Sequence, residues 1–237
     1  MENPVSTAGF SFFTSSNSMN ALSTYIDHTL LSPVASETDI RKICEEAWKM
    51  QFKAICVAPS YVPYVKEMME FCPVKIEVAT VIGFPLGSSV TSTKISEAET
   101  ALKDGATELD VVMNVSRFKS MAYLSVREEL QQLAKLAHSS GALIKVIIET
   151  AYLDTFELYT ACEICAEAGA DFVKTSTGFA PAGADAGTVK VMREILPPHV
   201  KIKASGGIKT AEQALAMIEA GAERIGTSHG PAILGLI

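Results

Sequence analysis

The chain has 237 residues, 48% of them hydrophobic, which is the size of one large domain or two small ones. Its formal net charge of −7 argues against indiscriminate binding to nucleic acid, so an anionic ligand would need a local site. No apolar run approaches the ~20 residues that span a bilayer, and five cysteines scattered through apolar segments indicate reduced thiols and a cytoplasmic location.

The first 20 residues are rich in Ser, Asn and Thr and show no hydrophobic periodicity. They also lack the basic start and long apolar core of a secretory signal. We therefore expect residues 1–20 to be a disordered extension and residues 21–237 to form the folded domain.

From there, short β-branched runs alternate with amphipathic helical segments, spaced as βα units are. The first helical segment, residues 36–51, places Ile40, Ile43 and Cys44 on one face. Ser36 is its predicted N-cap, with Asp39 at the third helical position. The predicted strands are residues 24–27, 53–57, 76–82, 108–113, 143–148, 171–175, 201–205 and 223–226.

The ends of the helical segments repeat a second signature. A Gly-Ala pair stands just before a strand at 105–106, 141–142, 169–170 and 221–222, and glycine favours the left-handed conformation that ends a helix. Eight strands alternating with helices, without a break in composition, predict an α/β fold, a single (β/α)8 TIM barrel with a short last helix. A doubly wound open sheet is the alternative, but no G-x-G-x-x-G follows the first strand.

Ionisable residues occupy alternate positions on the later strands. Because alternate residues of a barrel strand point inward, Asp110, Lys145, Lys174 and Lys203 are predicted to meet inside the barrel. The alternative for any one lysine is a strand end that reaches solvent. Clustering and burial lower the pKa of a lysine, and a neutral amine attacks carbonyls to form a Schiff base. With Asp110 moving protons through water, the pattern predicts class I aldolase chemistry.

The histidines and cysteines give no metal-binding pattern. The four histidines show no paired ligand spacing, so we expect no metal. Cys162 and Cys165 share a helical face and are predicted to pack in the core. Cys56 lies at the end of a predicted strand, where barrel active sites lie, and is predicted to line the pocket.

The loops after the seventh and eighth strands, ASGGIKT and GTSHGPAI, are rich in Gly and Ser. Loops in these two places form the usual phosphate site of such barrels. Gly206 and Gly207 let backbone N–H groups approach an anion, while Gly226 and Ser228 precede a short helix whose N-terminus favours negative charge. Gly178 could add a further N–H, and the alternative reading of both loops is a pair of tight turns.

A series of segments resembles, in order, those of the deoxyribose-phosphate aldolase family. These segments cover the chain from about Leu22 nearly to its end. The most specific pair is FVKTSTGF with KASGGIKT. The other matching segments are YIDHTLL, KAICVAPSYV, VIGFPLGSS, TKISEAETALKDGATELDVVMNV, KVIIETAYL and RIGTS. The resemblance implies a class I aldolase that reversibly cleaves 2-deoxy-D-ribose 5-phosphate to acetaldehyde and D-glyceraldehyde 3-phosphate. It implies a lysine Schiff base, no cofactor, small phosphosugar and aldehyde substrates, and neither a nucleic acid nor a membrane as partner.

The family's roles can be carried over residue by residue. Lys174 matches the lysine that forms the Schiff base, Lys203 the second lysine that perturbs it, and Asp110 the carboxylate of the proton relay. Lys145 matches a further lysine of this network. The substrate-binding residues that we expect, from the resemblance and the loop pattern together, are Asp27, Thr29, Cys56, Lys145, Gly178, Gly206, Gly207, Gly226 and Ser228.

The sequence also departs from the family pattern. Phe179 stands where some members carry a basic residue, His229 where many have a second serine, and the chain stops at Ile237 without the tyrosine-ending tail of some members. Two alternatives stay open: another Schiff-base phosphosugar aldolase, and a non-catalytic phosphosugar-binding barrel. Helical faces that carry Met and Tyr are compatible with a homodimer.

Overall fold

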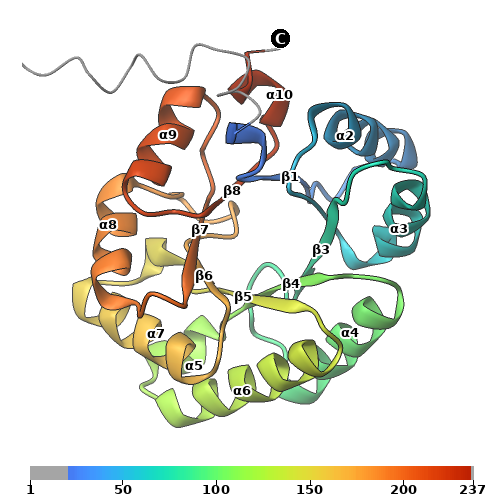
Figure 1. The fold of residues 1–237 in the computed structure, drawn as a ribbon. Coiled ribbons are helices and arrows are strands. Elements are labelled where there is room, and N and C mark those ends of the chain that lie inside the picture. The colour runs from blue at the N-terminus through green and yellow to red at the C-terminus, as the bar shows by residue number, and fades with distance from the viewer. Residues whose placement is uncertain (1–20, 236–237) are drawn as a thin grey trace, which may run out of the picture.

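A computed structural model describes residues 21–235 and shows a closed barrel of eight parallel strands (Figure 1). Each strand pairs with the next one in sequence, and β8 pairs with β1, which confirms the predicted (β/α)8 barrel and rules out the doubly wound sheet. The predicted extension, residues 1–20, lies outside the described residues. The strands are β1 (Ile26–Leu30), β2 (Ala54–Val57), β3 (Glu77–Ile82), β4 (Glu108–Val112), β5 (Leu143–Ile147), β6 (Phe172–Lys174), β7 (Lys201–Ser205) and β8 (Arg224–Thr227).

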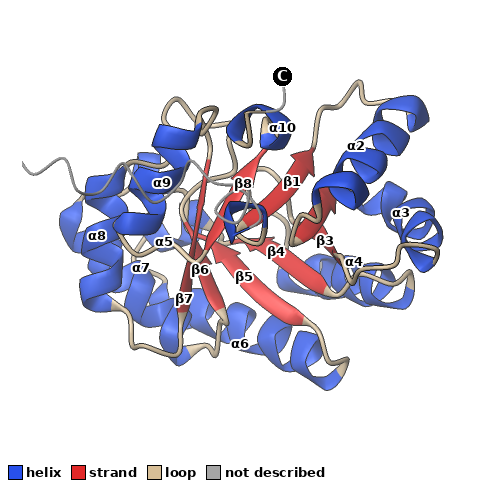
Figure 2. Cartoon of the chain, turned by 45° about the horizontal axis from the view of Figure 1, so that its top comes forward, coloured by secondary structure: helices blue, strands red, loops and turns tan. Residues whose placement is uncertain are grey.

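The strands form the barrel in the middle of the molecule, and the helices pack around it (Figure 2). The last helix is short, as predicted, and two single 3-10 turns, η2 (Pro59–Tyr61) and η3 (Thr150–Tyr152), follow β2 and β5. The α-helices are α2 (Glu37–Met50), α3 (Val62–Glu70), α4 (Thr91–Lys103), α5 (Val115–Lys119), α6 (Tyr123–Ser139), α7 (Thr155–Glu167), α8 (Ala186–Ile195), α9 (Ala211–Glu219) and α10 (Gly230–Ile233).

The helix ends follow the local signals in the sequence. Ser36 caps α2 with the expected capping box, since Asp39 N donates to Ser36 Oγ at 3.3 Å and Ser36 N donates to Asp39 Oδ2 at 2.8 Å. The four Gly-Ala helix ends are also confirmed, because each glycine has a positive φ: Gly105, Gly141, Gly169 and Gly221.

The first strand begins two residues and ends three residues later than predicted. The sequence predicts residues 24–27, but β1 continues through His28 and Thr29 to Leu30. His28 points out of the barrel and is still buried, with Nε2 2.7 Å from Glu46 Oε2 and its ring 5.1 Å from that of Phe52. Polar partners on both faces therefore permit a strand that hydrophobic alternation does not indicate.

The interior of the barrel differs from the layer between strands and helices. Outward-facing strand residues join the helices in one large hydrophobic core. Inside the barrel, β2 and β3 contribute only a small apolar cluster, Ala54, Cys56, Ala79 and Val81. The other six strands send ionisable groups into the same space.

Two further predictions concern whole helices. Cys162 and Cys165 are buried in α7, which confirms that they pack in the core. Among residues 21–235, no helix is long and apolar enough to cross a membrane.

Candidate active site

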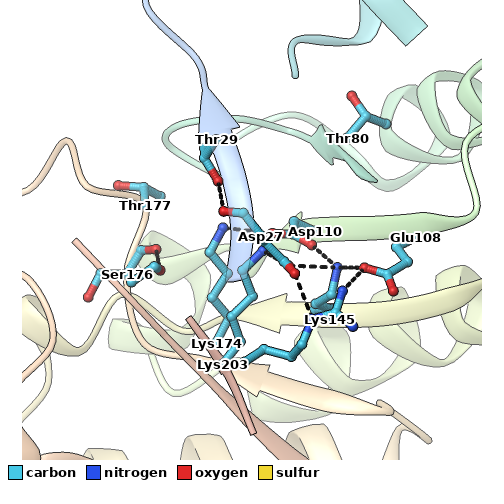
Figure 3. Close-up of polar contacts among 12 residues, drawn as sticks. Asp27, Thr29, Thr80, Glu108, Asp110, Lys145, Lys174, Ser176, Thr177 and Lys203 are labelled. Atoms are coloured by element: carbon cyan, nitrogen blue, oxygen red, sulfur yellow. Dashed lines mark hydrogen bonds and ion pairs between the residues drawn. The ribbon is translucent and has the colours of Figure 1, made fainter. Parts of the chain in front are cut away.

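Asp110 is the centre of the candidate site. The register places Asp110 beside Lys145 on β4 and β5, and Lys174 beside Lys203 on β6 and β7. Asp110 Oδ2 is 2.7 Å from the Nζ atoms of both Lys174 and Lys203, and Asp110 Oδ1 is 2.7 Å from Lys145 Nζ (Figure 3). The sequence prediction that these four residues meet is therefore confirmed.

Three more charged residues complete the cluster. Asp27 Oδ2 is 2.6 Å from Lys203 Nζ, and its Oδ1 is 2.6 Å from Arg224 Nε. Glu108 Oε2 lies 2.6 Å from Lys145 Nζ and 2.5 Å from Arg224 Nη2. Sequence reasoning missed Glu108 and Arg224, although Glu108 stands two residues before Asp110 and so shares its inward face.

The cluster holds more positive than negative groups. Three lysines and one arginine face three carboxylates, and none of the seven residues is more than 4% exposed. If all were ionised, one positive charge would remain uncompensated. A buried charge without a counterion is strongly unfavourable, so the cluster favours the loss of one proton.

The pKa shifts identify the lysine that loses this proton. Burial lowers the pKa of Lys174, and repulsion by Lys203 adds to this, against the attraction of Asp110. Burial also disfavours the charges of Lys203 and Lys145, but the neighbouring carboxylates outweigh it and raise the pKa of both. The three lysines likewise hold the pKa of Asp110 well below its usual range, although burial acts in the opposite direction. Lys174 is thus the amine that becomes neutral first.

A cavity of about 290 Å³ adjoins the cluster at the carboxyl ends of the strands. Lys174, the last residue of β6, lies on its wall, whereas Lys145 and Lys203 do not. Six of the predicted substrate-binding residues also line it: Thr29, Gly178, Gly206, Gly207, Gly226 and Ser228.

Three of the predicted substrate-binding residues are absent from this wall. Asp27, Cys56 and Lys145 are fully buried in the barrel interior. Asp27 and Lys145 are members of the ion-pair cluster, and Cys56 packs in the inner apolar cluster, where burial raises its thiol pKa. Direct contact of these three residues with a substrate stays a prediction.

The loops on the cavity wall are tied to one another by short polar contacts. Thr227 Oγ1 donates to Ile208 O at 2.7 Å and accepts from His229 N at 2.9 Å, which joins the loops after β7 and β8. Ser205 Oγ donates to Ser176 O at 2.6 Å, which joins the loops after β6 and β7. The wall is therefore held in place before a ligand arrives.

Two glycines shape the loop after β7. Gly206 and Gly207 have φ values of 89° and 79°, which other residues adopt only with strain. A side chain at Gly183, in the loop after β6, would have its Cβ 2.0 Å from Gly206 O. The two loops thus pack backbone against backbone, and only small residues permit this approach.

Glu149 anchors the loop that follows Lys174. Its carboxylate is buried and accepts hydrogen bonds from the backbone N–H of Thr177, at 3.2 Å, and from the Thr177 hydroxyl. Thr177 Oγ1 in turn accepts from Phe179 N at 3.1 Å. Glu149 itself has a φ of 54°, an uncommon conformation that tends to be kept at functional sites. Sequence analysis did not identify Glu149 or Thr177, because no local pattern marks them.

The rim of the cavity carries the residues that depart from the family pattern. Phe179 is exposed and its ring packs edge-on against Phe84, with centroids 5.2 Å apart. His229 Nδ1 lies 3.0 Å from Ser228 Oγ. Lys209 also lines the cavity and supplies a positive charge there that the sequence reading had not assigned.

Comparisons with known proteins agree on one family. The profile of the DeoC/LacD family aldolases matches residues 22–235. A deoxyribose-phosphate aldolase from Thermococcus gammatolerans is 51% identical over 210 residues, which is 89% of this chain and 93% of that protein. Two solved structures are similar to this chain. The aldolase QR15 is 45% identical with a TM-score of 0.85, and the match covers 90% of this chain and 94% of that one. The tetrameric deoxyribose phosphate aldolase from Aeropyrum pernix is 38% identical with a TM-score of 0.86, and the match covers 92% of each chain.

Proposed function

The chain belongs to the DeoC/LacD family of aldolases and is a lyase, and we propose that it reversibly cleaves 2-deoxy-D-ribose 5-phosphate. The products are acetaldehyde and D-glyceraldehyde 3-phosphate. The observation that carries this proposal is the position of Lys174. It is the one lysine of the cluster that both lies on the cavity wall and has a lowered pKa.

Lys174 acts as the nucleophile. Its neutral amine adds to the aldehyde carbon of the open-chain sugar, and loss of water gives the iminium ion. A base then removes the proton of the hydroxyl group two carbons away, and the bond between the second and third carbons breaks. Its electron pair moves into the iminium to form an enamine, and glyceraldehyde 3-phosphate leaves. Protonation of the enamine carbon and hydrolysis of the new iminium release acetaldehyde and restore the amine.

Asp110 and its lysines move the protons. The Asp110 carboxylate contacts the Nζ atom of Lys174 directly, so it can relay protons to and from the reacting atoms through a water molecule in the cavity. Lys203 and Lys145 hold this carboxylate ionised. The positive charge of Lys203 also disfavours a proton on Lys174, which keeps the nucleophile free.

The phosphate is bound at the other side of the cavity. Gly178, Gly206, Gly207, Gly226 and Ser228 line this region and offer backbone N–H groups and a hydroxyl. Lys209 adds a positive charge. This arrangement would hold the phosphate away from Lys174 and direct the aldehyde end toward it.

Trapping with borohydride tests this function. The protein is incubated with acetaldehyde and sodium borohydride, digested, and analysed by mass spectrometry. A reduced two-carbon adduct on Lys174, together with cleavage of 2-deoxyribose 5-phosphate in a coupled assay, is the expected result. An adduct on Lys203 or Lys145 would move the nucleophile to that residue, and folded protein without any adduct or cleavage would favour a phosphosugar-binding barrel. An adduct without cleavage of this substrate would favour another Schiff-base aldolase.

The remaining expectations belong to the same proposal. That the enzyme is cytoplasmic, forms a homodimer and acts without a cofactor stays a prediction. The absence of nucleic acid and membrane partners also stays a prediction. The relative from Aeropyrum pernix is described as a tetramer. Size-exclusion chromatography with light scattering would distinguish a dimer from a tetramer.

A further inference from the structure

We propose that Glu108 and Arg224 set the pH at which Lys174 becomes a free amine, although neither residue contacts Lys174 or lines the cavity. They are positioning residues that act through a chain of buried ion pairs. The inference rests on the proposed role of Lys174 as the Schiff-base nucleophile, and it assigns a function to two residues that the mechanism itself does not use.

The ion pairs form a closed ring of alternating charge. Every neighbouring pair in the ring is linked by a contact of 2.5 to 2.7 Å. The ring runs in the order Asp110, Lys145, Glu108, Arg224, Asp27, Lys203 and back to Asp110.

The ring is electrically balanced without Lys174. It contains three carboxylates and three cations, whose charges cancel. Lys174 is attached to it only at Asp110 Oδ2, an oxygen that Lys203 already contacts at the same distance of 2.7 Å. A proton on Lys174 is therefore the one positive charge in the cluster that has no anion of its own.

The balance predicts opposite effects for the two residues. Removing the charge of Glu108 leaves the ring with a net positive charge, which disfavours a proton on Lys174. Removing the charge of Arg224 leaves a net negative charge, which favours that proton. Because the groups are buried, each change acts with little screening by salt or water.

Other ionisable groups face the same space and have to be considered. Cys56 projects from β2, and burial raises its thiol pKa, so it stays neutral. β3 contributes Ala79 and Val81 to the interior, and Glu77 at its start pairs with Lys75 at 2.8 Å, whose charge Glu108 also attracts. This pair stays unchanged in the variants below. On the cavity side, Lys209 and His229 line the wall, and both stay unchanged in the variants below.

The test compares Glu108→Gln, Arg224→Met and the double variant, with Arg224→Lys as a control that keeps the charge. The rate of adduct formation on Lys174 with acetaldehyde and sodium cyanoborohydride is measured by mass spectrometry from pH 5 to 9, as is kcat/KM for cleavage. We expect the midpoint of the rise with pH to move down by about one unit in Glu108→Gln and up by about one unit in Arg224→Met. The double variant and Arg224→Lys should stay near the wild type.

The result that overturns the proposal is a midpoint that does not move, or that moves in the same direction in both single variants, in protein shown to be folded by circular dichroism. A purely structural role would lower the rate at every pH and leave the midpoint in place. Glu108→Gln conserves the shape of the side chain, so its shift decides the matter even if Arg224→Met fails to fold. Wild-type protein without an adduct on Lys174 would instead overturn the proposed function, so the two failures are distinct.

Discussion

Lys174 combines two environments that exclude each other for most lysines. Its Nζ atom contacts a buried carboxylate, yet its side chain also reaches the wall of an open cavity. Lys145 and Lys203 have only the first environment and keep raised pKa values. A residue that is buried without a counterion of its own, and that still meets solvent molecules and substrates, is suited to be a nucleophile.

Replacing Lys174 by Met should abolish turnover without loss of the fold. The nucleophile is gone, so kcat should fall by about five orders of magnitude. The ring of ion pairs stays balanced, so the free energy of unfolding should be unchanged or higher. Coupled assays and urea unfolding measure the two quantities.

Lys203→Met is the matched control for this variant. It removes a cation of the ring and leaves Asp27 and Asp110 short of one partner, so it should lower the free energy of unfolding by about 3 kcal/mol. Equal stability losses in the two variants would contradict the distinction between Lys174 and the ring.

Glu149→Gln should weaken binding of the phosphorylated substrate specifically. Glu149 Oε2 accepts the hydroxyl of Thr177, and both carboxylate oxygens face its N–H, so a glutamine places an NH2 donor against that N–H and replaces charge-assisted hydrogen bonds by weaker neutral ones. We expect KM for 2-deoxyribose 5-phosphate to rise about tenfold. Activity toward 2-deoxyribose without phosphate should change little, and an equal loss on both sugars would show that Glu149 acts on the Schiff-base end instead.

At the scale of single residues, part of the candidate site can be predicted from the sequence. The alternation of strand residues is enough to bring Asp110 and three lysines together, because each is conspicuous in an apolar run. Glu108 and Arg224 stand at strand starts, where a charged residue is usually solvated, so their types do not predict burial, although Glu108 shares the inward face of Asp110. The left-handed backbone of Glu149 depends on contacts with β6 and its loop, and no local signal encodes such contacts.

At the scale of elements, the cavity is built from loops whose backbones approach closely. The helices that follow β6 and β7 begin only after these loops, so the loop conformations are set by glycine and by bonds such as Ser205 Oγ to Ser176 O. Helix caps and the four Gly-Ala ends were readable in the sequence because they depend on residues at most five positions apart. The extent of β1 was not readable, since it depends on Glu46 and on the lysines inside the barrel.

Gly183→Ala should displace the loop after β7. The added Cβ would lie 2.0 Å from Gly206 O, a distance that no side-chain rearrangement can relieve. Overpacking of this kind costs about 1–3 kcal/mol, and the shift of Gly206 should raise KM for the phosphorylated substrate severalfold. Thermal unfolding and steady-state kinetics measure the two effects.

Gly187→Ala in α8 is the control for the same loop region. Its added Cβ would meet only the side chain of Asp185, with Oδ1 at 3.1 Å, and it lies outside the cavity wall. KM should therefore match the wild type. A similar rise in KM in both variants would mean that mobility of the segment, rather than contact with Gly206, controls binding.

At the scale of the whole molecule, the ion-pair ring occupies part of the barrel interior, where hydrophobic side chains usually pack. A cluster of apolar residues occupies the interior along β2 and β3, and the ring joins β1, β4, β5, β7 and β8 across the centre. The number and order of the strands followed from the sequence, because each βα unit carries its own periodicity. The ion-pair ring inside the barrel could not be predicted in the same way. It depends on pairs such as Asp27 and Arg224, which lie 197 residues apart and which no local pattern relates.

The stability of the whole barrel should therefore depend on acidic pH in a particular way. In the folded protein, burial opposes ionisation of Asp27 and Asp110, but the surrounding cations outweigh it and lower both pKa values far below about 3.9, the value in an unfolded chain. A carboxylate with a lowered folded pKa contributes stability that is fully present above its unfolded pKa and is lost as the pH falls toward the folded one. We expect the free energy of unfolding, measured with urea, to fall steeply as the pH drops below about 4.

The double variant Asp110→Asn/Lys203→Met separates this ring from the ordinary surface carboxylates. It removes one carboxylate and one cation together, so the net charge of the cluster is conserved and no single partner is left alone at their contact. As the pH falls through about 3.9, the unfolded state then takes up as much as one proton fewer, relative to the folded state. The slope of the unfolding free energy against pH should be smaller than in the wild type by up to about 1.4 kcal/mol per pH unit, with the full difference reached below about pH 3. Identical slopes would show that Asp110 does not contribute to the acid sensitivity, and that other carboxylates carry it.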